Sequence, residues 1–248
     1  MKRAVAALTG LARCALLCLL LVELGLLSLA WNLVAPLLHR LLTPQRGAAL
    51  GRVAIARIYG TLWRTAQWLG VMQIDAGGLE TLADEPGGLI VAANHPTMFD
   101  ALIVVSRLQR GVCIMKAELM RNVFVGPGAR LARYIRNDSP HGLVRGAVDC
   151  LRDGGQLVMF PEGTRTAARS LNPFRPGVTL IAQKAQVPIQ TVIIETDSPY
   201  LRKGWPIWRA PAFPIVIRAR LGDRFAPQAD HQALLERIEC YFIGELGQ

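Results

Sequence analysis

One long apolar run near the N-terminus constrains the fold of this chain more than any other feature. Residues 14–38 read CALLCLLLVELGLLSLAWNLVAPLL, and Glu23 is the only acidic or basic side chain in them. About 20 consecutive apolar residues are enough to cross the hydrocarbon core of a bilayer as a helix. We therefore predict an N-terminal membrane anchor over residues 1–40, formed by a spanning helix. A helix in the plane of the membrane and a cleaved signal peptide are the alternatives.

The segment that follows the apolar run is basic and amphipathic. In residues 46–70, Arg46, Arg52, Arg57 and Arg64 are interleaved with apolar side chains. This pattern is typical of a helix that lies on an anionic bilayer surface. It fits equally an ordinary helix that packs on the protein and leaves its arginines in solvent. We predict a second unit over residues 41–248, which residues 41–70 connect to the membrane.

The composition indicates an anionic partner. The chain is 52% hydrophobic and its formal net charge is +10, which suits a membrane surface, a phosphorylated substrate or a nucleic acid. The sequence contains no zinc-finger spacing, no basic heptads and no ribonucleoprotein aromatic signature, so we expect no nucleic acid. The five cysteines are scattered and form no C-x-x-C pair, which indicates reduced thiols. We expect the second unit to lie at the cytoplasmic face of the inner membrane, although basic residues flank both ends of the apolar run.

Beyond residue 70, short apolar runs alternate with helical stretches and turn signals. This alternation predicts an α/β domain with a central mixed β-sheet that helices cover on its faces. The predicted strands are 71–76, 88–93, 111–116, 156–160, 189–194 and 214–221. The predicted helices are 98–110, 141–154, 175–186 and 228–242. In α/β folds the functional residues gather where strands end and helices begin.

The stretch 89-LIVAANHPTMFDA-101 has polar residues at such a junction. Asn94 is predicted to cap the next helix, with Pro96 in its first turn. Within one regular helix, His95 and Asp100 would point about 140° apart and could not meet. If His95 lies in the turn instead, Asp100 can bond one imidazole nitrogen and leave the other free as a general base. A histidine that only satisfies the turn is the alternative.

Two further stretches carry charged or polar side chains. In 160-FPEGTR-165, proline ends a strand, glycine permits a tight turn, and Arg165 offers donors suited to phosphate. The alternative is a polar turn with an internal pair between Glu162 and Arg165. Residues 116–138 are rich in arginine and contain Lys116, and they could form a cationic wall beside a cleft or a solvated basic face. The sequence contains no cluster of metal ligands, so we expect no metal.

In combination, these stretches resemble the glycerolipid acyltransferase family. The resemblance rests on the order Asn-His-x-x-x-x-Asp, Lys-x-Glu-Leu with a later arginine, and Phe-Pro-Glu-Gly-Thr-Arg, and it covers roughly residues 85–195. It implies transfer of a fatty acyl group to a lipid hydroxyl from acyl-carrier protein or acyl-CoA, without a cofactor. The second unit would then be an acyltransferase domain. The favoured acceptor is a lysolipid in the membrane, 1-acyl-sn-glycerol-3-phosphate, which would give phosphatidic acid.

The resemblance also implies roles for individual residues. His95 would deprotonate the acceptor hydroxyl and Asp100 would orient it. Lys116 would support the oxyanion of the thioester. The residues implied in binding the acceptor are Glu162, Gly163, Thr164, Arg165 and Arg136, the two arginines on its phosphate.

This sequence departs from the family pattern in ways that leave the acceptor open. Thr97 stands where serine is frequent, and 133-RYIRND-138 replaces a block rich in glycine and phenylalanine, so that Arg133 competes with Arg136. An ornithine or other amino-acid lipid, or a specialised glycolipid, would need the same dyad. A thioesterase and a non-catalytic lipid-binding scaffold are the alternatives from other classes. The absence of a G-x-S-x-G elbow speaks against a serine thioesterase.

Overall fold

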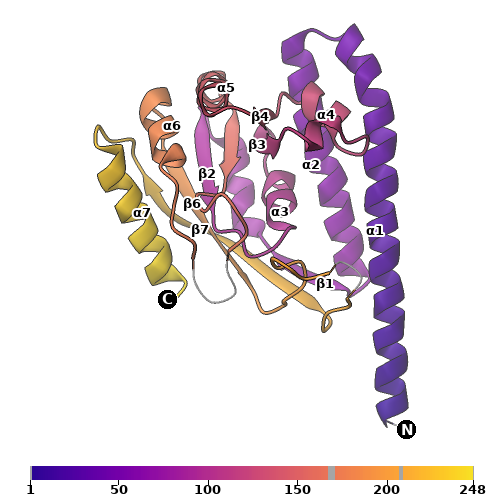
Figure 1. Cartoon of the computed structure of the whole chain (residues 1–248). Helices are drawn as coiled ribbons and strands as arrows, with labels where there is room; N and C mark the ends of the chain where they lie inside the picture. The colour runs from indigo at the N-terminus through magenta and orange to yellow at the C-terminus, as the bar shows by residue number, and fades with distance from the viewer. Residues whose placement is uncertain (1, 167–170, 207–208, 248) are drawn as a thin grey trace.

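Seven strands form one sheet in the part of the chain that the computed structural model describes, residues 2–166, 171–206 and 209–247 (Figure 1). The strands are β1 (Met72–Asp75), β2 (Leu89–Ala93), β3 (Gly111–Lys116), β4 (Ile135–Asn137), β5 (Gln156–Met159), β6 (Ile189–Thr196) and β7 (Ile215–Phe225). Their order across the sheet is β1-β7-β6-β2-β5-β3-β4. All neighbouring strands run parallel except β6 and β7. The carboxyl ends of β6, β2, β5, β3 and β4 therefore meet at one edge of the sheet.

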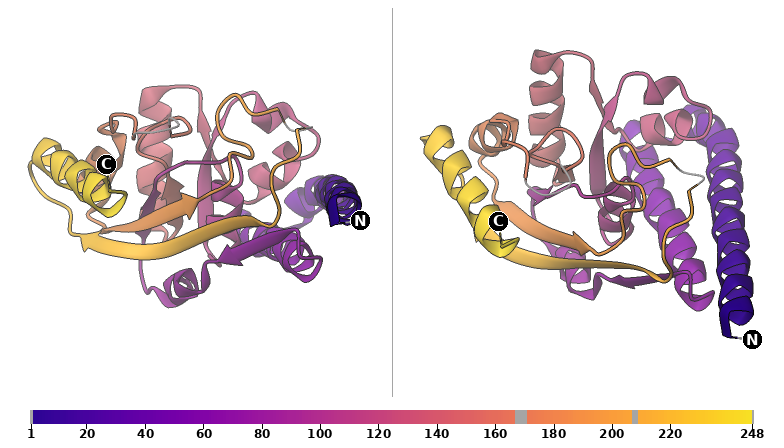
Figure 2. Two further views of the ribbon diagram at one scale, coloured as in Figure 1. Left: turned by 90° about the horizontal axis from the view of Figure 1, so that it is seen from below. Right: turned by 60° about the horizontal axis from the view of Figure 1, so that its bottom comes forward.

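Helices cover both faces of this sheet (Figure 2). One face carries α5 (Pro140–Arg152), α6 (Gly177–Ala185) and α7 (His231–Glu245). The other carries α2 (Pro44–Trp68), α3 (Asp100–Ser106) and the 3-10 helix η1 (Gly77–Asp84). The long helix α1 (Lys2–Leu41) lies outside α2, and a short 3-10 helix η2 (Leu119–Arg121) and α4 (Gly126–Leu131) connect β3 to β4. The core thus forms two apolar layers, one on each face of the sheet.

Local sequence signals set where several helices begin. At the start of α2, the Thr43 hydroxyl accepts a hydrogen bond from the Arg46 N–H, and Pro44 occupies the first turn. Ser139 caps α5 in the same way, and the Asp230 carboxylate caps α7 by accepting from two backbone N–H groups. These caps bond backbone donors that have no partner inside the helix.

The predicted fold class, a mixed sheet flanked by helices, is confirmed. The predicted strands and helices all occur, but the helix predicted over 98–110 is shorter, because the residues up to Phe99 form a turn before α3. The strand predicted over 214–221 continues to Phe225. Three elements in the basic stretch, η2, α4 and β4, were not predicted, because each is too short to show a periodic pattern. The division into an anchor and a domain at residue 40 stays a prediction.

Helix α1 has two different faces. By length and composition, its segment Gly10–Leu41 could cross a membrane. One face packs on the protein through buried residues that include Leu17, Leu20 and Ala35. The opposite face exposes a row of large apolar side chains to the surroundings. The row consists of Leu11, Leu19, Val22, Leu26, Leu33, Val34, Leu37 and Leu41.

A buried asparagine fixes α1 to the rest of the chain. The Asn32 side chain donates to the carbonyl oxygens of Ser28 and Phe124, both at 2.7 Å, and accepts from the Gly128 N–H at 2.6 Å. A Cβ at Gly128 would lie only 2.4 Å from the Trp31 ring nitrogen, so a side chain there would push α4 away from α1. The C-terminal part of α1 is therefore bonded both to α4 and to the segment that precedes it.

We predict that Asn32→Ala lowers the free energy of unfolding by about 1–3 kcal/mol, because the Gly128 N–H and the Phe124 carbonyl lose their partner in a buried site. Denaturant unfolding in detergent micelles measures this change. Leu33→Ala is the matched control, because Leu33 is the next residue and is 71% exposed. Equal losses of unfolding free energy in the two variants would contradict a stabilising role for the Asn32 hydrogen bonds.

Candidate active site

The site is built on the carboxyl end of β2, a strand whose residues are all buried. Asn94 follows it, and its side-chain amide donates to the carbonyl of Ile194 and accepts from the Ile194 N–H, both at 2.7 Å. Asn94 thus continues the pairing of β2 with β6, and the prediction that it caps the next helix is wrong. This pairing fixes the chain direction where His95 leaves the sheet.

His95 and Asp100 meet as the turn geometry required. His95 Nδ1 lies 2.9 Å from Asp100 Oδ2, and Asp100 is the first residue of α3. Thr97 holds the carboxylate from the other side: its N–H donates to Oδ2 at 2.7 Å and its hydroxyl to Oδ1 at 2.6 Å. With three donors around it, Asp100 favours the tautomer in which Nδ1 carries the proton. Nε2 then has the free lone pair that a general base needs.

Burial determines the electrostatics of this pair. Asp100 is fully buried, whereas the His95 side chain is 19% exposed. Burial raises the pKa of Asp100 above its ordinary value, and the hydrogen bonds from His95 and Thr97 offset this only in part. The Phe160 ring stacks on the imidazole, with centroids 4.0 Å apart. One side of the imidazole is thus covered, and the exposed remainder is the part that a substrate can reach.

The turn after β5 contacts this site through Glu162. The Glu162 carboxylate is almost fully buried and accepts hydrogen bonds from the His95 N–H, the Thr166 hydroxyl, and the backbone and side-chain nitrogens of Asn172. The Thr166 N–H donates to the His95 carbonyl in return. Gly163 has a φ of +67°, a backbone conformation that residues other than glycine rarely adopt. Glu162 therefore ties this turn to the backbone of His95.

Arg165 contacts the loop between β6 and β7. Its Nη1 donates to the carbonyl of Leu201 at 2.8 Å and to that of Arg202 at 3.3 Å. Leu201 is buried and has a φ of +61°, and its carbonyl also accepts from the Met98 N–H. Arg165 thus links the turn after β5 to a loop that contacts the turn after His95. Within the described part of the chain, the other guanidinium N–H groups of Arg165 have no protein acceptor and can bind other groups.

The other predicted site residues lie on the same edge of the sheet but farther along it. Lys116 ends β3 and Arg136 lies in β4, and both side chains are exposed. Arg136 pairs with Asp138. Arg133, the alternative to Arg136 as a phosphate ligand, is exposed. Its backbone is in the left-handed region, with a φ of +56°, just after α4. Thr164 is half-buried and Gly163 exposed in the turn after β5.

Sequence reasoning missed three residues that shape the site. Phe160 was read only as the end of a strand, and its position at a strand end before Pro161 was the available signal. Thr166 and Asn172 bond Glu162, but no local pattern connects them to it. Among the described residues, no group of three histidine, cysteine or acidic side chains is placed to hold a metal ion.

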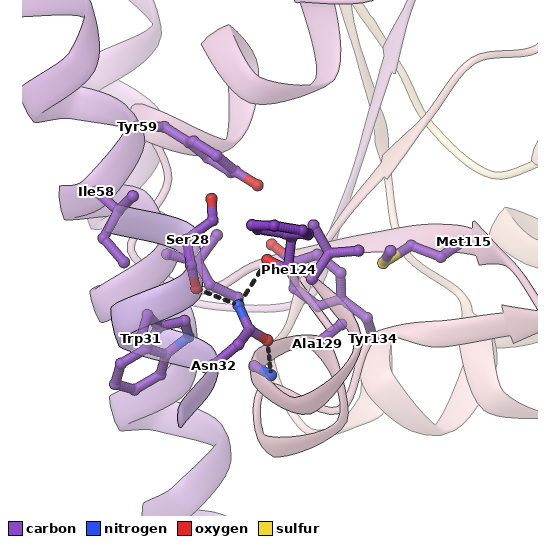
Figure 3. Close-up of a pocket in the computed structure, with 12 residues that line it drawn as sticks. Ser28, Trp31, Asn32, Ile58, Tyr59, Met115, Phe124, Ala129 and Tyr134 are labelled. Atoms are coloured by element: carbon purple, nitrogen blue, oxygen red, sulfur yellow. Dashed lines mark hydrogen bonds between the residues drawn. The ribbon is translucent and has the colours of Figure 1, made fainter. Parts of the chain in front are cut away.

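A small cavity lies to one side of these residues, between α1, α2, α4 and β3 (Figure 3). It encloses about 50 Å³ and its lining is mostly apolar, with Tyr59 and Phe124 among the lining residues. The Trp31 ring nitrogen and the Tyr134 hydroxyl are buried there without a protein partner among the described residues. A cavity of this size can hold water, which would bond both groups. None of the predicted site residues lines it.

Comparisons with known proteins agree with this arrangement. The sequence pattern of the Acyltransferase family matches residues 73–195. A 1-acyl-sn-glycerol-3-phosphate acyltransferase of Limnanthes alba is 27% identical over 175 residues, which cover 67% of this chain and 60% of that protein. The protein of the same name from Pseudomonas aeruginosa is 23% identical over 186 residues, which cover 73% of this chain and 71% of that protein.

A solved structure shares the fold. The crystal structure of the 1-acyl-sn-glycerophosphate acyltransferase from Thermotoga maritima matches with a TM-score of 0.65 and 21% identity, over 90% of this chain and 95% of that chain. The matched residues 73–195 contain both His95 and Asp100. The chain belongs to the glycerolipid acyltransferase family, as its motifs indicated.

We predict that Asp100→Asn preserves or raises the stability of the fold. A raised pKa means that the folded state binds the proton more tightly than the unfolded state, so wild-type stability falls as pH rises from about 4 through the raised pKa. The asparagine variant lacks this contribution, so its advantage should grow with pH over that window. Unfolding free energies at a series of pH values measure it.

Asp100→Ala is the matched comparison for this prediction. It removes the acceptor for His95 and Thr97 and should cost about 1–3 kcal/mol. A wild type that gains stability over Asp100→Asn as pH rises would show that the pKa of Asp100 is lowered in the folded protein.

Proposed function

We propose that this protein transfers a fatty acyl group from a thioester to the free hydroxyl of 1-acyl-sn-glycerol-3-phosphate, which gives phosphatidic acid. The observation that carries the proposal is the His95–Asp100 pair at the edge of the sheet, in a chain of this family. The acceptor is supported by the names of the relatives. The thioester is that of acyl-carrier protein or coenzyme A.

The reaction needs one base, and His95 is placed for that task. Nε2 takes the proton of the acceptor hydroxyl as its oxygen attacks the thioester carbon. The tetrahedral intermediate collapses to the ester and expels the thiolate, which takes up the proton that the imidazolium gives back. Asp100 stabilises the imidazolium during this cycle. No acyl-enzyme is required.

Other residues act through position and charge. We assign Glu162 to holding the backbone of His95, because its oxygens are occupied by protein donors. Arg165 and Arg136 would bind the acceptor phosphate, as arginine forks suit it. Lys116 would lie near the oxyanion, and Gly163 and Thr164 would line the acceptor path.

The structure bears on how the protein sits at the membrane. A helix of 40 residues is about 60 Å long, roughly twice the thickness of a hydrocarbon core. Because one face of α1 packs on the protein along much of this length, we favour the in-plane alternative, with the outer apolar row in the bilayer. We propose that the membrane is the inner membrane and that the active site lies at its cytoplasmic face.

The function is tested by a comparison of wild type and His95→Ala. Membranes that contain each protein receive lysophosphatidic acid and a labelled fatty acyl thioester of acyl-carrier protein or coenzyme A. Mass spectrometry identifies the lipid products. We expect phosphatidic acid from the wild type and a loss of about 10²–10⁴-fold in the variant, because the general base is gone. A second arm omits the lysolipid. Thioester cleavage without an acceptor would identify a thioesterase, and the absence of turnover in both arms would identify a scaffold.

Arg165 has a separate test. We expect Arg165→Ala to raise the KM for lysophosphatidic acid about 10-fold or more, because a charge-assisted bond to phosphate is lost. The KM for a monoacylglycerol, which lacks the phosphate, should change little. Equal losses with both acceptors would assign Arg165 to holding the carbonyls of Leu201 and Arg202 alone.

A further inference from the structure

The segment between β3 and α4, residues 117–125, exposes large apolar side chains. Leu119 and Phe124 are each 43% exposed and Val123 is 62% exposed. Apolar side chains grouped in this way on a surface segment mark a contact with a partner more often than an ordinary loop. The short helix η2 lies within this segment and packs on α4, which in turn packs on α1 (Figure 1).

The backbone of this segment bonds largely to itself. The Asn122 side chain accepts from the Phe124 N–H at 2.8 Å, and the Asn122 carbonyl accepts from the Gly126 N–H at 2.8 Å. The Asn122 N–H donates to the carbonyl of Leu119. Backbone groups that enter an apolar medium must find partners within the protein, because that medium offers none. Several backbone groups around Asn122 therefore already have partners within the protein.

The segment is also tied to the helix with the outer apolar row. Asn32, on the inner face of α1, bonds the Phe124 carbonyl directly, and Figure 3 shows this bond beside the Phe124 ring. The contact holds Phe124 against the inner face of α1, and the outer row of α1 includes Leu33, the residue that follows Asn32. The segment and α1 are thus held together although they are distant in the sequence.

The charges around the segment are mostly positive and favour an anionic partner. Lys116 and Arg121 are exposed on either side of Leu119, and Arg133 is exposed at the end of α4. Glu118 is the only acidic residue between Lys116 and Arg133. Apolar side chains bordered by cations suit an anionic bilayer, in which the apolar groups pass the headgroups and the cations stay at the phosphates.

We propose that Leu119, Val123 and Phe124 insert into an anionic bilayer and form a second membrane contact beside α1. The carboxyl end of β3, which precedes this segment, lies on the same sheet edge as the end of β2 before His95. The insertion would hold this edge at the interface, where a lipid acceptor and a soluble thioester can both reach it. The contact with the bilayer does not depend on which lipid is acylated.

Depth-dependent quenching tests the insertion. In a chain with Cys14, Cys18 and Cys240 replaced by serine, an environment-sensitive fluorophore is attached through Val123→Cys, while the buried Cys113 and Cys150 remain. The protein is placed in phosphatidylcholine vesicles with or without phosphatidylglycerol, which contain a nitroxide-labelled lipid. Leu26→Cys on the outer row of α1 is the positive control. Ile243→Cys on α7, also exposed, is the negative control.

We expect strong quenching at Val123→Cys and Leu26→Cys, none at Ile243→Cys, and deeper quenching at Val123→Cys when phosphatidylglycerol is present. A Val123→Cys label that behaves like the one on α7 would overturn the proposal. A label that becomes shielded as protein concentration rises, without quenching by lipid, would assign the surface to a second copy of the chain.

A kinetic arm separates this inference from the proposed function. Val123→Asp should lower the rate several-fold with lysolipid in vesicles and leave the rate with a dispersed short-chain lysolipid unchanged. Equal rates for wild type and variant on vesicles would contradict a contact that positions the active site. Because quenching requires no catalysis, it decides the membrane contact even if no acyl transfer is found.

Discussion

The hydrogen bonds of the buried Glu162 carboxylate are the interactions on which the candidate active site depends. It lies between two parallel strand ends, and it receives hydrogen bonds from the turn after β2, from Thr166 and from Asn172. A buried charge is tolerated only when it is fully hydrogen-bonded, so these donors and Glu162 require each other. The arrangement fixes the backbone of His95 before any substrate binds.

Asp100 carries the second half of the same design. Its burial disfavours its own charge, whereas the proposed function needs that charge to orient and stabilise His95, which lies 2.9 Å away. Thr97 and His95 supply the hydrogen bonds that keep the carboxylate in place. In the proposed function, the charged carboxylate would lower the stability of the fold but provide a geometry that a neutral residue could not, as functional sites commonly do.

In the proposed function, helix α1 would join the catalytic edge to the membrane, because its two faces carry different side chains. The inner face uses small and polar residues, including Asn32 and Ala35, to approach α4 closely, while the outer face is a row of large aliphatic side chains. A lipid acceptor does not leave the bilayer readily, so a catalytic edge must be held at the interface. The bond from Asn32 to the segment after β3 makes the anchor and that edge parts of one packed unit.

The sequence by itself determined much of this protein. Short apolar runs predicted six of the seven strands. Turn signals placed His95 and Glu162 after strand ends and Asp100 in the first turn of the next helix, where their family motifs could be recognised. Local signals missed β4 and α4, which are too short for a period, and they gave Asn94 the wrong partner, because its contact with Ile194 lies 100 residues away. They also could not show that Arg165 contacts Leu201, that Thr166 and Asn172 surround Glu162, or that Asn32 bonds Phe124. These contacts join segments that only the assembled sheet and the packed helices bring together, so the tertiary structure alone decided them.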